Sequence, residues 1–169
     1  MTPYAGLAAS AVLLLATLLA LPAAAAPRGS TAIDHSQQYT ACMQLAKTRP
    51  RQAYASANAW YDRGGADAAQ HCAAIALFGM GEYVEAANRL ERIADAQPGA
   101  RNALRAELYA QAGQAWLLAS YPDRALVAQG NALALAPDSV DLLVDRAVTL
   151  AGIERLGEAI AEETDLAGR

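Results

Sequence analysis

A single stretch decides the fold: GEYVEAANRLERIADAQP, residues 81–98. Its apolar and small residues recur at steps of three, four and three, which places them on one stripe of an α-helix; they are Tyr83, Ala86, Leu90 and Ile93. Gly81 precedes the stripe and Pro98 follows it, as start and stop signals. The stretch therefore predicts helix 82–97, whose apolar face needs other helices to cover it.

The composition is that of a helical protein. The chain has 169 residues, of which 54% are hydrophobic and 6% aromatic, with alanine and leucine dominant. Helix-forming residues are plentiful and alternating β-branched runs are absent, so we expect an all-α fold in one domain. The net charge is −4, and the 13 basic residues are scattered rather than clustered. Nucleic acid is therefore not an expected partner.

The pattern of residues 81–98 recurs along the chain. Four alanines occupy the corresponding place, at steps of 33, 39 and 34 residues: Ala53, Ala86, Ala125 and Ala159. Pro98 and Pro137 end two of the copies at the same distance. Gln129 and Glu163 depart from the pattern, because the corresponding residue of the stretch 81–98 is the large apolar Leu90.

The helices that precede these copies share a second pattern. YAQAGQAW places Tyr109, Ala112, Gly113 and Trp116 at the spacing aromatic, apolar, small, aromatic. This resembles the first-helix signature of the tetratricopeptide repeat, W-x-x-L-G-x-x-Y, and a period near 34 residues is that of the same family. Ala74 and Ala147 hold the place of Gly113, although Arg146 stands where leucine is usual.

The resemblance implies a right-handed α-solenoid of antiparallel helix pairs, with about four helical hairpins. It divides residues 36–169 into a degenerate pair and three repeats: 36–65, 66–98, 100–137 and 138–169. The expected helices are 36–48, 50–63, 66–79, 82–97, 100–119, 138–151 and 154–167, with helix 82–97 covered by its two neighbours. Small residues let the helices of a pair approach closely: Ala74 with Ala86, Gly113 with Ala125, and Ala147 with Ala159.

The N-terminus reads as a targeting segment. Residues 1–25 contain the apolar run AVLLLATLLAL, then Pro22 and small residues, which is the order of a cleaved signal peptide. The alternative is an uncleaved membrane anchor, because MTPY carries no basic residue. Residues 26–35 read as a linker. We expect a periplasmic or secreted protein or, under the alternative, one anchored in the inner membrane and facing the periplasm.

Two cysteines follow this segment, Cys42 and Cys72. In an oxidising compartment an even count predicts a disulfide, which here would staple the degenerate pair to the first good repeat. The alternative adds His35 and His71 and proposes zinc. It is disfavoured because adjacent helix residues such as His71 and Cys72 point about 100° apart.

The sequence contains no recognisable catalytic motif. The patterns G-x-S-x-G, H-E-x-x-H and G-x-x-x-x-G-K are all missing. We therefore expect no enzymatic activity, cofactor or metal. His71 is the one titratable residue that could have an unusual role, and the simpler reading is an exposed histidine.

In tetratricopeptide arrays the first helices line a concave groove, and the resemblance carries that role to places on three helices here: Ala68, His71, Ile75 and Phe78; Glu107, Ala110, Gln114 and Leu117; and Asp141, Val144, Val148 and Ala151. This lining is mostly apolar and lacks the Lys and Asn pairs of carboxylate clamps. It suggests an apolar peptide or a helix as the ligand, unless side-chain packing buries the stripe.

Two functions remain open. The first is a non-enzymatic protein–protein interaction scaffold of the bacterial cell envelope. The second is an accessory subunit or ligand-binding module that docks on a periplasmic enzyme through His71. The C-terminal repeat ends either in a polar cap or as a shortened array, in which case Ile160 and Leu166 would contribute to a self-association surface.

Overall fold

Helices make up nearly all of the residues that the structure describes. The computed structural model describes residues 34–96 and 102–167, with side chains described as far as residue 155. The helices are α1 (His35–Thr48), α2 (Pro50–Trp60), α3 (Ala66–Gly79), α4 (Tyr83–Asp95), α5 (Asn102–Leu118), α6 (Pro122–Leu135) and α7 (Val140–Ala167). These residues include no strand, which confirms the all-α class. The expected signal segment, most of the expected linker and Pro98 lie outside the described residues.

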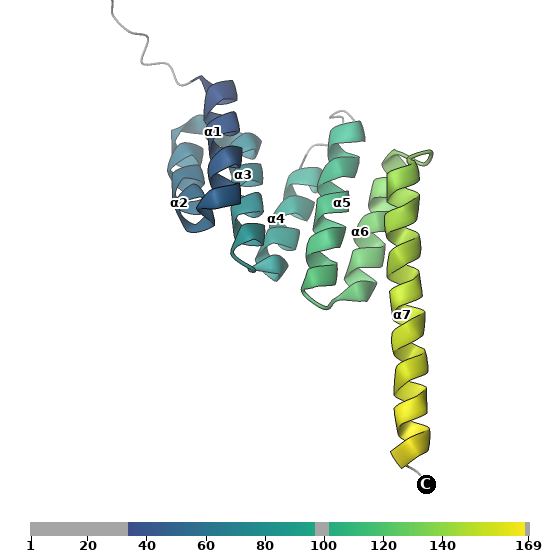
Figure 1. The fold of residues 1–169 in the computed structure, drawn as a ribbon. Coiled ribbons are helices and arrows are strands. Elements are labelled where there is room, and N and C mark those ends of the chain that lie inside the picture. Colours follow the sequence, from purple (N-terminus) through teal and green to yellow (C-terminus); the bar gives the residue numbers. More distant parts are fainter. Residues whose placement is uncertain (1–33, 97–101, 168–169) are drawn as a thin grey trace, which may run out of the picture. The chain divides into compact units, whose positions relative to one another are not determined.

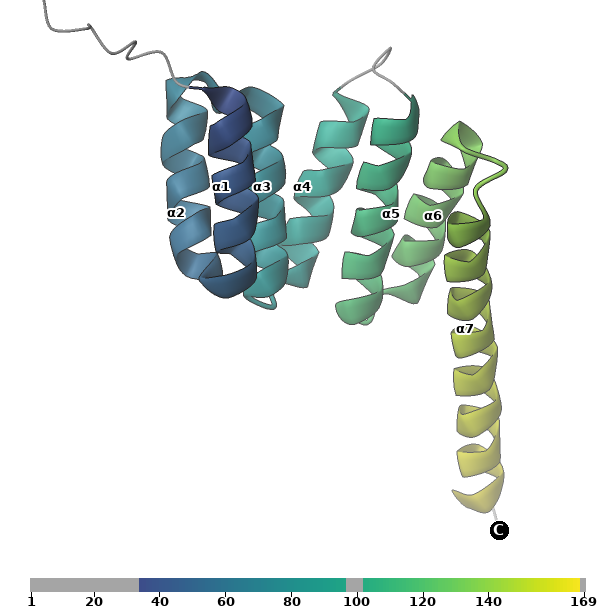
Figure 2. The same cartoon turned by 45° about the horizontal axis from the view of Figure 1, so that its top comes forward.

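Consecutive helices pack against one another. Each helix contacts the next one along the chain, and α1 also contacts α3 (Figure 1). The view in Figure 2 shows the same side-by-side order from α3 to α7. As predicted, α4 is covered by α3 and α5.

The stripe of α4 is buried where the sequence predicts it. Ala86, Leu90 and Ile93 are buried, and Tyr83 is half-buried with its ring edge against Phe78, 5.3 Å between centroids. Leu90 is fully buried, and such a side chain contributes about 1.5–3 kcal/mol through removal from water. The stripe is therefore a principal part of the core.

Small residues set the distance between α5 and α6. A Cβ atom added to Gly113 would lie 3.0 Å from Cγ of Gln129 and 3.4 Å from the carbonyl oxygen of Ala125, closer than most side chains tolerate. Trp116 on the same helix is buried, and its indole N–H donates to Glu91 of α4 at 2.9 Å. Gly113 thus allows the close approach of α6, whereas Trp116 forms a hydrogen bond with α4.

The turns after α3 and α5 close in the same way. Gly81 and Ser120 each take a left-handed conformation, with φ of 82° and 64°. In both turns the next N–H bonds to the carbonyl five residues back, at 3.0 Å after Gly81 and 2.9 Å after Ser120. This is the Schellman motif, which ends a helix where the chain reverses.

The C-terminal helix differs from the prediction. The structure has one continuous helix, α7, in place of the expected helices 138–151 and 154–167. Glu154 stands where Gly81 and Ser120 stand in the other turns, five residues before the repeat alanine. Glutamate favours the helix over the left-handed conformation, and a single upstream glycine, Gly152, costs a helix only about 1 kcal/mol. The helix therefore continues.

The straight course of α7 leaves an apolar face uncovered. Ala147 is exposed, so the predicted close approach at this residue is wrong, and the side chain of Ala159 lies outside the described ones. In both views the C-terminal half of α7 extends beyond its neighbour α6. The large apolar side chains exposed on α7 are Val140, Leu143, Val144, Val148 and Leu150.

The contact between α6 and α7 combines the buried Leu142 with several hydrogen bonds. The Gln129 amide nitrogen donates to the Thr149 hydroxyl at 2.9 Å and to the Asp145 carbonyl at 3.4 Å. Arg146 donates to the Leu126 carbonyl at 2.6 Å. Two of the departures from the repeat pattern therefore belong to one interface, where hydrogen bonds accompany apolar packing.

The predicted disulfide is confirmed. Cys42 of α1 and Cys72 of α3 are joined, with 6.1 Å between their Cα atoms. Both are buried in a small cluster with Ala57 and Ala73. Because the bond occupies both sulfurs, the zinc alternative has no thiolate ligands.

The connection from α2 to α3 depends on two glycines. The α-helical part of the predicted helix 50–63 ends at Trp60, and a π-helical turn, Tyr61–Gly65, follows it with a kink at Arg63 and Gly64. Gly64 has a φ of 90°, and a Cβ atom on Gly65 would lie 2.8 Å from the Trp60 ring. The buried Trp60 side chain thus lies directly under the turn.

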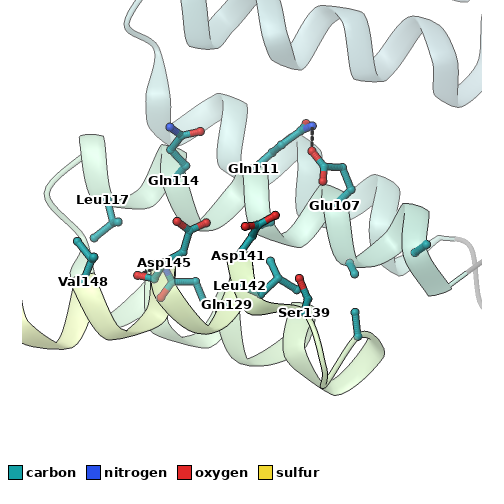
Figure 3. A pocket seen from close by; sticks show the side chains of 14 residues that line it. Glu107, Gln111, Gln114, Leu117, Gln129, Ser139, Asp141, Leu142, Asp145 and Val148 are labelled. Atoms are coloured by element: carbon teal, nitrogen blue, oxygen red, sulfur yellow. Dashed lines mark hydrogen bonds between the residues drawn. The ribbon is translucent and has the colours of Figure 1, made fainter.

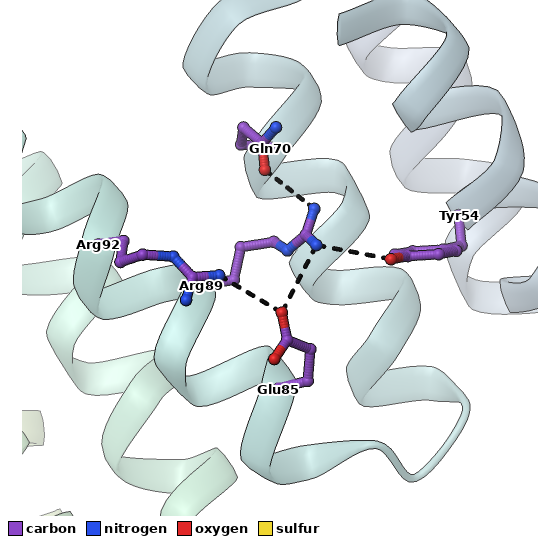
Figure 4. Close-up of polar contacts among 5 residues, drawn as sticks. All are labelled: Tyr54, Gln70, Glu85, Arg89 and Arg92. Carbon is purple, nitrogen blue, oxygen red and sulfur yellow. Dashed lines mark hydrogen bonds and ion pairs between the residues drawn. The ribbon is translucent and has the colours of Figure 1, made fainter.

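A polar cluster around Arg89 joins α2, α3 and α4 (Figure 4). The Arg89 guanidinium donates to Gln70 at 2.9 Å and to Tyr54 at 3.5 Å, and it lies 5.6 Å from the Tyr54 ring centroid. Glu85 pairs with it at 3.6 Å and with Arg92 at 3.4 Å. Both arginines share the one carboxylate, and Nε of Arg89 is buried without a hydrogen-bond partner in the described part of the chain; because the cluster joins three helices, we assign it a structural role.

Candidate functional site

A groove runs between α5 and α7, above α6 (Figure 3). It has a volume of about 530 Å³. We call it the α5–α7 groove. Its polar lining consists of Glu107, Gln111, Gln114, Gln129, Ser139, Asp141 and Asp145, and its apolar lining of Ala103, Ala106, Ala110, Leu117, Ala136, Leu142 and Val148.

Helical periodicity brings these residues to one face. On α5 the lining residues recur at steps of three and four, from Ala103 to Leu117. On α7 the sequence Asp141, Asp145, Val148 does the same. Leu117 and Val148 point toward each other at one end of the groove, so this end is apolar (Figure 3).

The floor of the groove contains a buried amide. Gln129 of α6 is 3% exposed, and its nitrogen is used by Thr149 and by the Asp145 carbonyl. Its oxygen, Oε1, is buried and has no hydrogen-bond partner. Buried polar atoms are nearly always satisfied, so an unsatisfied acceptor in a groove is an unusual feature.

The groove is acidic. Glu107 comes from α5, and Asp141 and Asp145 come from α7, where their carboxylates point toward α5 (Figure 3). Within the described part of the chain, neither aspartate side chain has a hydrogen bond or an ion pair. None of the 14 lining residues is basic. The arrangement can hold a cation or a group with several hydrogen-bond donors.

A second hollow surrounds His71. It has a volume of about 280 Å³ and is lined by Tyr39, Asp67, Ala68, His71, Ile93, Leu104 and Leu108. The Tyr39 hydroxyl lies 2.7 Å from Nδ1 of His71, and Nε2 of His71 lies 2.8 Å from Oε1 of Gln111. The Gln111 nitrogen donates to Glu107 at 2.8 Å. These hydrogen bonds connect the hollow to the α5–α7 groove.

The Glu107 carboxylate fixes the direction of this chain of hydrogen bonds. Because Gln111 donates its N–H to the carboxylate, its oxygen faces His71 and Nε2 of His71 must donate. Nδ1 of His71 then accepts from the Tyr39 hydroxyl. Burial lowers the pKa of His71 below 6.5, opposed in part by the Gln111 hydrogen bond and the Glu107 charge. Burial also raises the pKa of Tyr39 above 10.0. The imidazole is therefore neutral at neutral pH.

The α5–α7 groove contains no activated nucleophile, and in the second hollow the Tyr39 hydroxyl, which donates to His71, has its pKa raised by burial. The only hydroxyl that lines the α5–α7 groove is that of Ser139, and in the described residues no hydrogen bond joins it to a base. The same residues contain no cluster of three or more His, Cys, Asp or Glu side chains that could hold a metal ion.

The predicted groove residues lie in three places. Gln114, Leu117 and Val148 come together in the α5–α7 groove, whereas His71 lies in the second hollow. Ile75 and Phe78 are half-buried and Val144 is exposed, and none of these three lines either hollow.

Several site residues were not predicted. The sequence could have indicated Asp145, because it follows Asp141 by one helical turn and therefore lies on the same helix face. Gln129 was recognised as a departure from the repeat but not as part of a site. Tyr39 and Gln111 had no signal, because they lie 32 and 40 residues from His71.

In residues 34–96 and 102–167, no helix combines the length and the apolar character needed to cross a membrane. No family model, curated protein or solved structure matches the chain.

Proposed function

We propose that the protein is a non-enzymatic interaction scaffold of the bacterial cell envelope, which binds a segment of a partner protein in the α5–α7 groove. The proposed architecture is a short solenoid of antiparallel helix pairs similar to tetratricopeptide repeats. Arrays of this kind use the surface of their first helices for recognition.

The repeated turn supports this architecture. The same Schellman motif follows α3 and α5, at corresponding places in the two copies of the sequence pattern. Small residues occupy the predicted places on both helix pairs, and Ala74, Ala86, Gly113 and Ala125 are all buried. The turns in the structure and the alanines of the sequence pattern thus recur at the same distance along the chain.

The groove itself is the observation that carries the proposal. It lies between α5 and α7, the first helices of two successive copies, and its volume of about 530 Å³ can hold several side chains. Leu117, Leu142 and Val148 offer apolar contacts, and polar residues flank them. Binding sites commonly combine an apolar surface with a few convergent polar groups.

The envelope location rests on two features. Disulfides persist in oxidising compartments, and Cys42 and Cys72 form one. The apolar segment near the N-terminus has the order of a signal peptide.

The hollow around His71 favours a second candidate, an accessory subunit that docks on an enzyme. The exposed Leu104 side chain lines that hollow beside the half-buried imidazole. An apolar anchor next to a polar group is a common docking arrangement.

Capture of partners from an envelope extract by the full mature chain tests the proposal. Val148→Glu places a charge in the groove, and Val127→Glu on α6 is the matched control, since these valines are 65% and 64% exposed. Loss of the captured partner with Val148→Glu alone is the expected result. If Val148→Glu binds as the wild type does and Leu104→Glu abolishes capture, the second candidate replaces the first.

A further inference from the structure

We infer that the α5–α7 groove recognises a basic side chain, lysine or arginine, on the partner segment. This inference rests on the proposed function, because it specifies the chemistry of the ligand in the same groove. Two observations support it: the carboxylates of the groove, which no basic side chain among the described residues pairs, and the apolar surface beside them; an unsatisfied amide oxygen lies beneath the floor.

The carboxylates of the groove carry like charges that repel one another. Asp141 and Asp145 lie one helical turn apart on α7, a spacing at which like charges destabilise a helix. Glu107 adds a third negative charge from α5. In the described part of the chain no basic side chain pairs with any of the three. A cation in the groove would relieve this repulsion.

The amide oxygen of Gln129 is an acceptor that lacks a donor. Its nitrogen donates to the Thr149 hydroxyl and to the Asp145 carbonyl, and this orientation leaves the oxygen without a donor among the described residues. Gln129 lines the groove from below, and because its oxygen is enclosed, a donor in the groove would reach it only after the side chain rotates outward. Guanidinium and ammonium groups carry several donors and no acceptor, which matches a site of carboxylates and one amide oxygen.

The apolar end of the groove favours a long side chain over a small ion. Leu117, Leu142 and Val148 line the same groove as the carboxylates. Lysine and arginine bury their methylene stems along apolar surface while the charged group reaches polar partners. The three carboxylates are also not gathered into a metal-binding cluster. A basic residue with apolar neighbours therefore matches the groove in both charge and shape.

Peptide selection on the full mature chain tests the inference. Random peptides of about twelve residues are displayed, those retained by the wild type are sequenced, and one is synthesised with a fluorescent label. We expect a lysine or arginine beside apolar residues in the selected set. Replacing an essential arginine by citrulline, which keeps the shape and removes the charge, should weaken binding about tenfold, as loss of a charge-assisted contact does.

The groove variant is Asp141→Asn with Asp145→Asn, and its control is Asp62→Asn with Asp123→Asn, which removes the same charge outside the groove. The groove variant should bind the arginine peptide about tenfold more weakly and should no longer distinguish arginine from citrulline. The control should change affinity less than about twofold, because distant exposed charges are screened by salt. Circular dichroism establishes that both variants are folded.

The outcomes separate the two proposals. If peptides are selected and Val148→Lys, which brings a competing cation into the groove, abolishes their binding, but they lack basic residues or ignore the aspartate substitutions, the groove binds peptides and the basic-residue inference is wrong. If no peptide is selected, or Val148→Lys has no effect on those that are, the proposed function fails and the inference fails with it.

Discussion

Replacing both Cys42 and Cys72 with alanine should lower the free energy of unfolding by about 3.6 kcal/mol. The disulfide closes a loop of 30 residues. The chain-entropy relation gives about 12 cal/mol/K for a loop of this length, hence about 3.6 kcal/mol at room temperature. Alanine is preferred to serine because both positions are buried, and a serine hydroxyl there would need a hydrogen-bond partner.

Urea unfolding followed by circular dichroism measures the effect. With a slope of about 2 kcal/mol/M, the midpoint of the double variant should fall by about 1.8 M. Wild-type protein in reductant should show a similar fall, and the variant should not respond to reductant. Hydrogen exchange should accelerate most in α1, which the bond ties to α3, and least in α5 and α6. If the midpoint moves by less than about 0.3 M, constraint of the unfolded chain is not how this bond contributes.

Other substitutions test the core, the α6–α7 contact and the buried histidine. Leu90→Ala should cost about 3 kcal/mol in a urea titration, because the fully buried side chain leaves a cavity; a cost below about 1 kcal/mol would contradict this packing. Thr149→Val should cost about 1–2 kcal/mol by removing the acceptor of Gln129, and adding Gln129→Leu should recover most of that loss. A double variant less stable than Thr149→Val alone would refute the pairing. Because the pKa of His71 is lowered in the folded state, the unfolded chain binds the proton first as pH falls below 6.5, and stability should decline from there until the folded-state pKa is passed. His71→Gln should remove this component of the pH dependence of thermal unfolding, and an unchanged profile would contradict the assignment.

The sequence predicts the helices best where glycines flank them. Helix 66–79 was predicted with the bounds that α3 has, because Gly64 and Gly65 precede it and Gly79 and Gly81 mark its end. The buried stripe of α4 was predicted from spacing alone, since a strongly amphipathic helix has only one face to bury. Local signals suffice for such elements.

The sequence predicts two helices where α7 is continuous, because the repeat alanine recurs here without a residue suited to the turn. Ala159 keeps the repeat spacing, but spacing does not reverse a chain. The reversal needs a residue that accepts a positive φ five positions earlier, and Glu154 does not meet this need as Gly81 and Ser120 do. Glu154 is therefore the residue of the sequence that indicates a continuous helix.

The candidate site also has one part that the sequence predicts and one part that it does not. Gln114, Leu117 and Val148 were predicted as groove residues because helical periodicity fixes which face they occupy. The contacts of His71 with Tyr39 and Gln111 depend on how three helices are placed in space. One sequence without an alignment contains no record of such tertiary pairs, so this part of the site required coordinates.

The disulfide also gives the chain a direction of assembly. Its two cysteines lie on α1 and α3, and these helices need nothing beyond residue 79 to meet. A chain that emerges N-terminus first into an oxidising compartment can therefore lock its first three helices before α5 to α7 have appeared. Later helices would add one at a time to a covalently closed base, because each packs mainly on its predecessor. Loss of structure would run in the opposite direction, starting from α7, which has one neighbour and no staple.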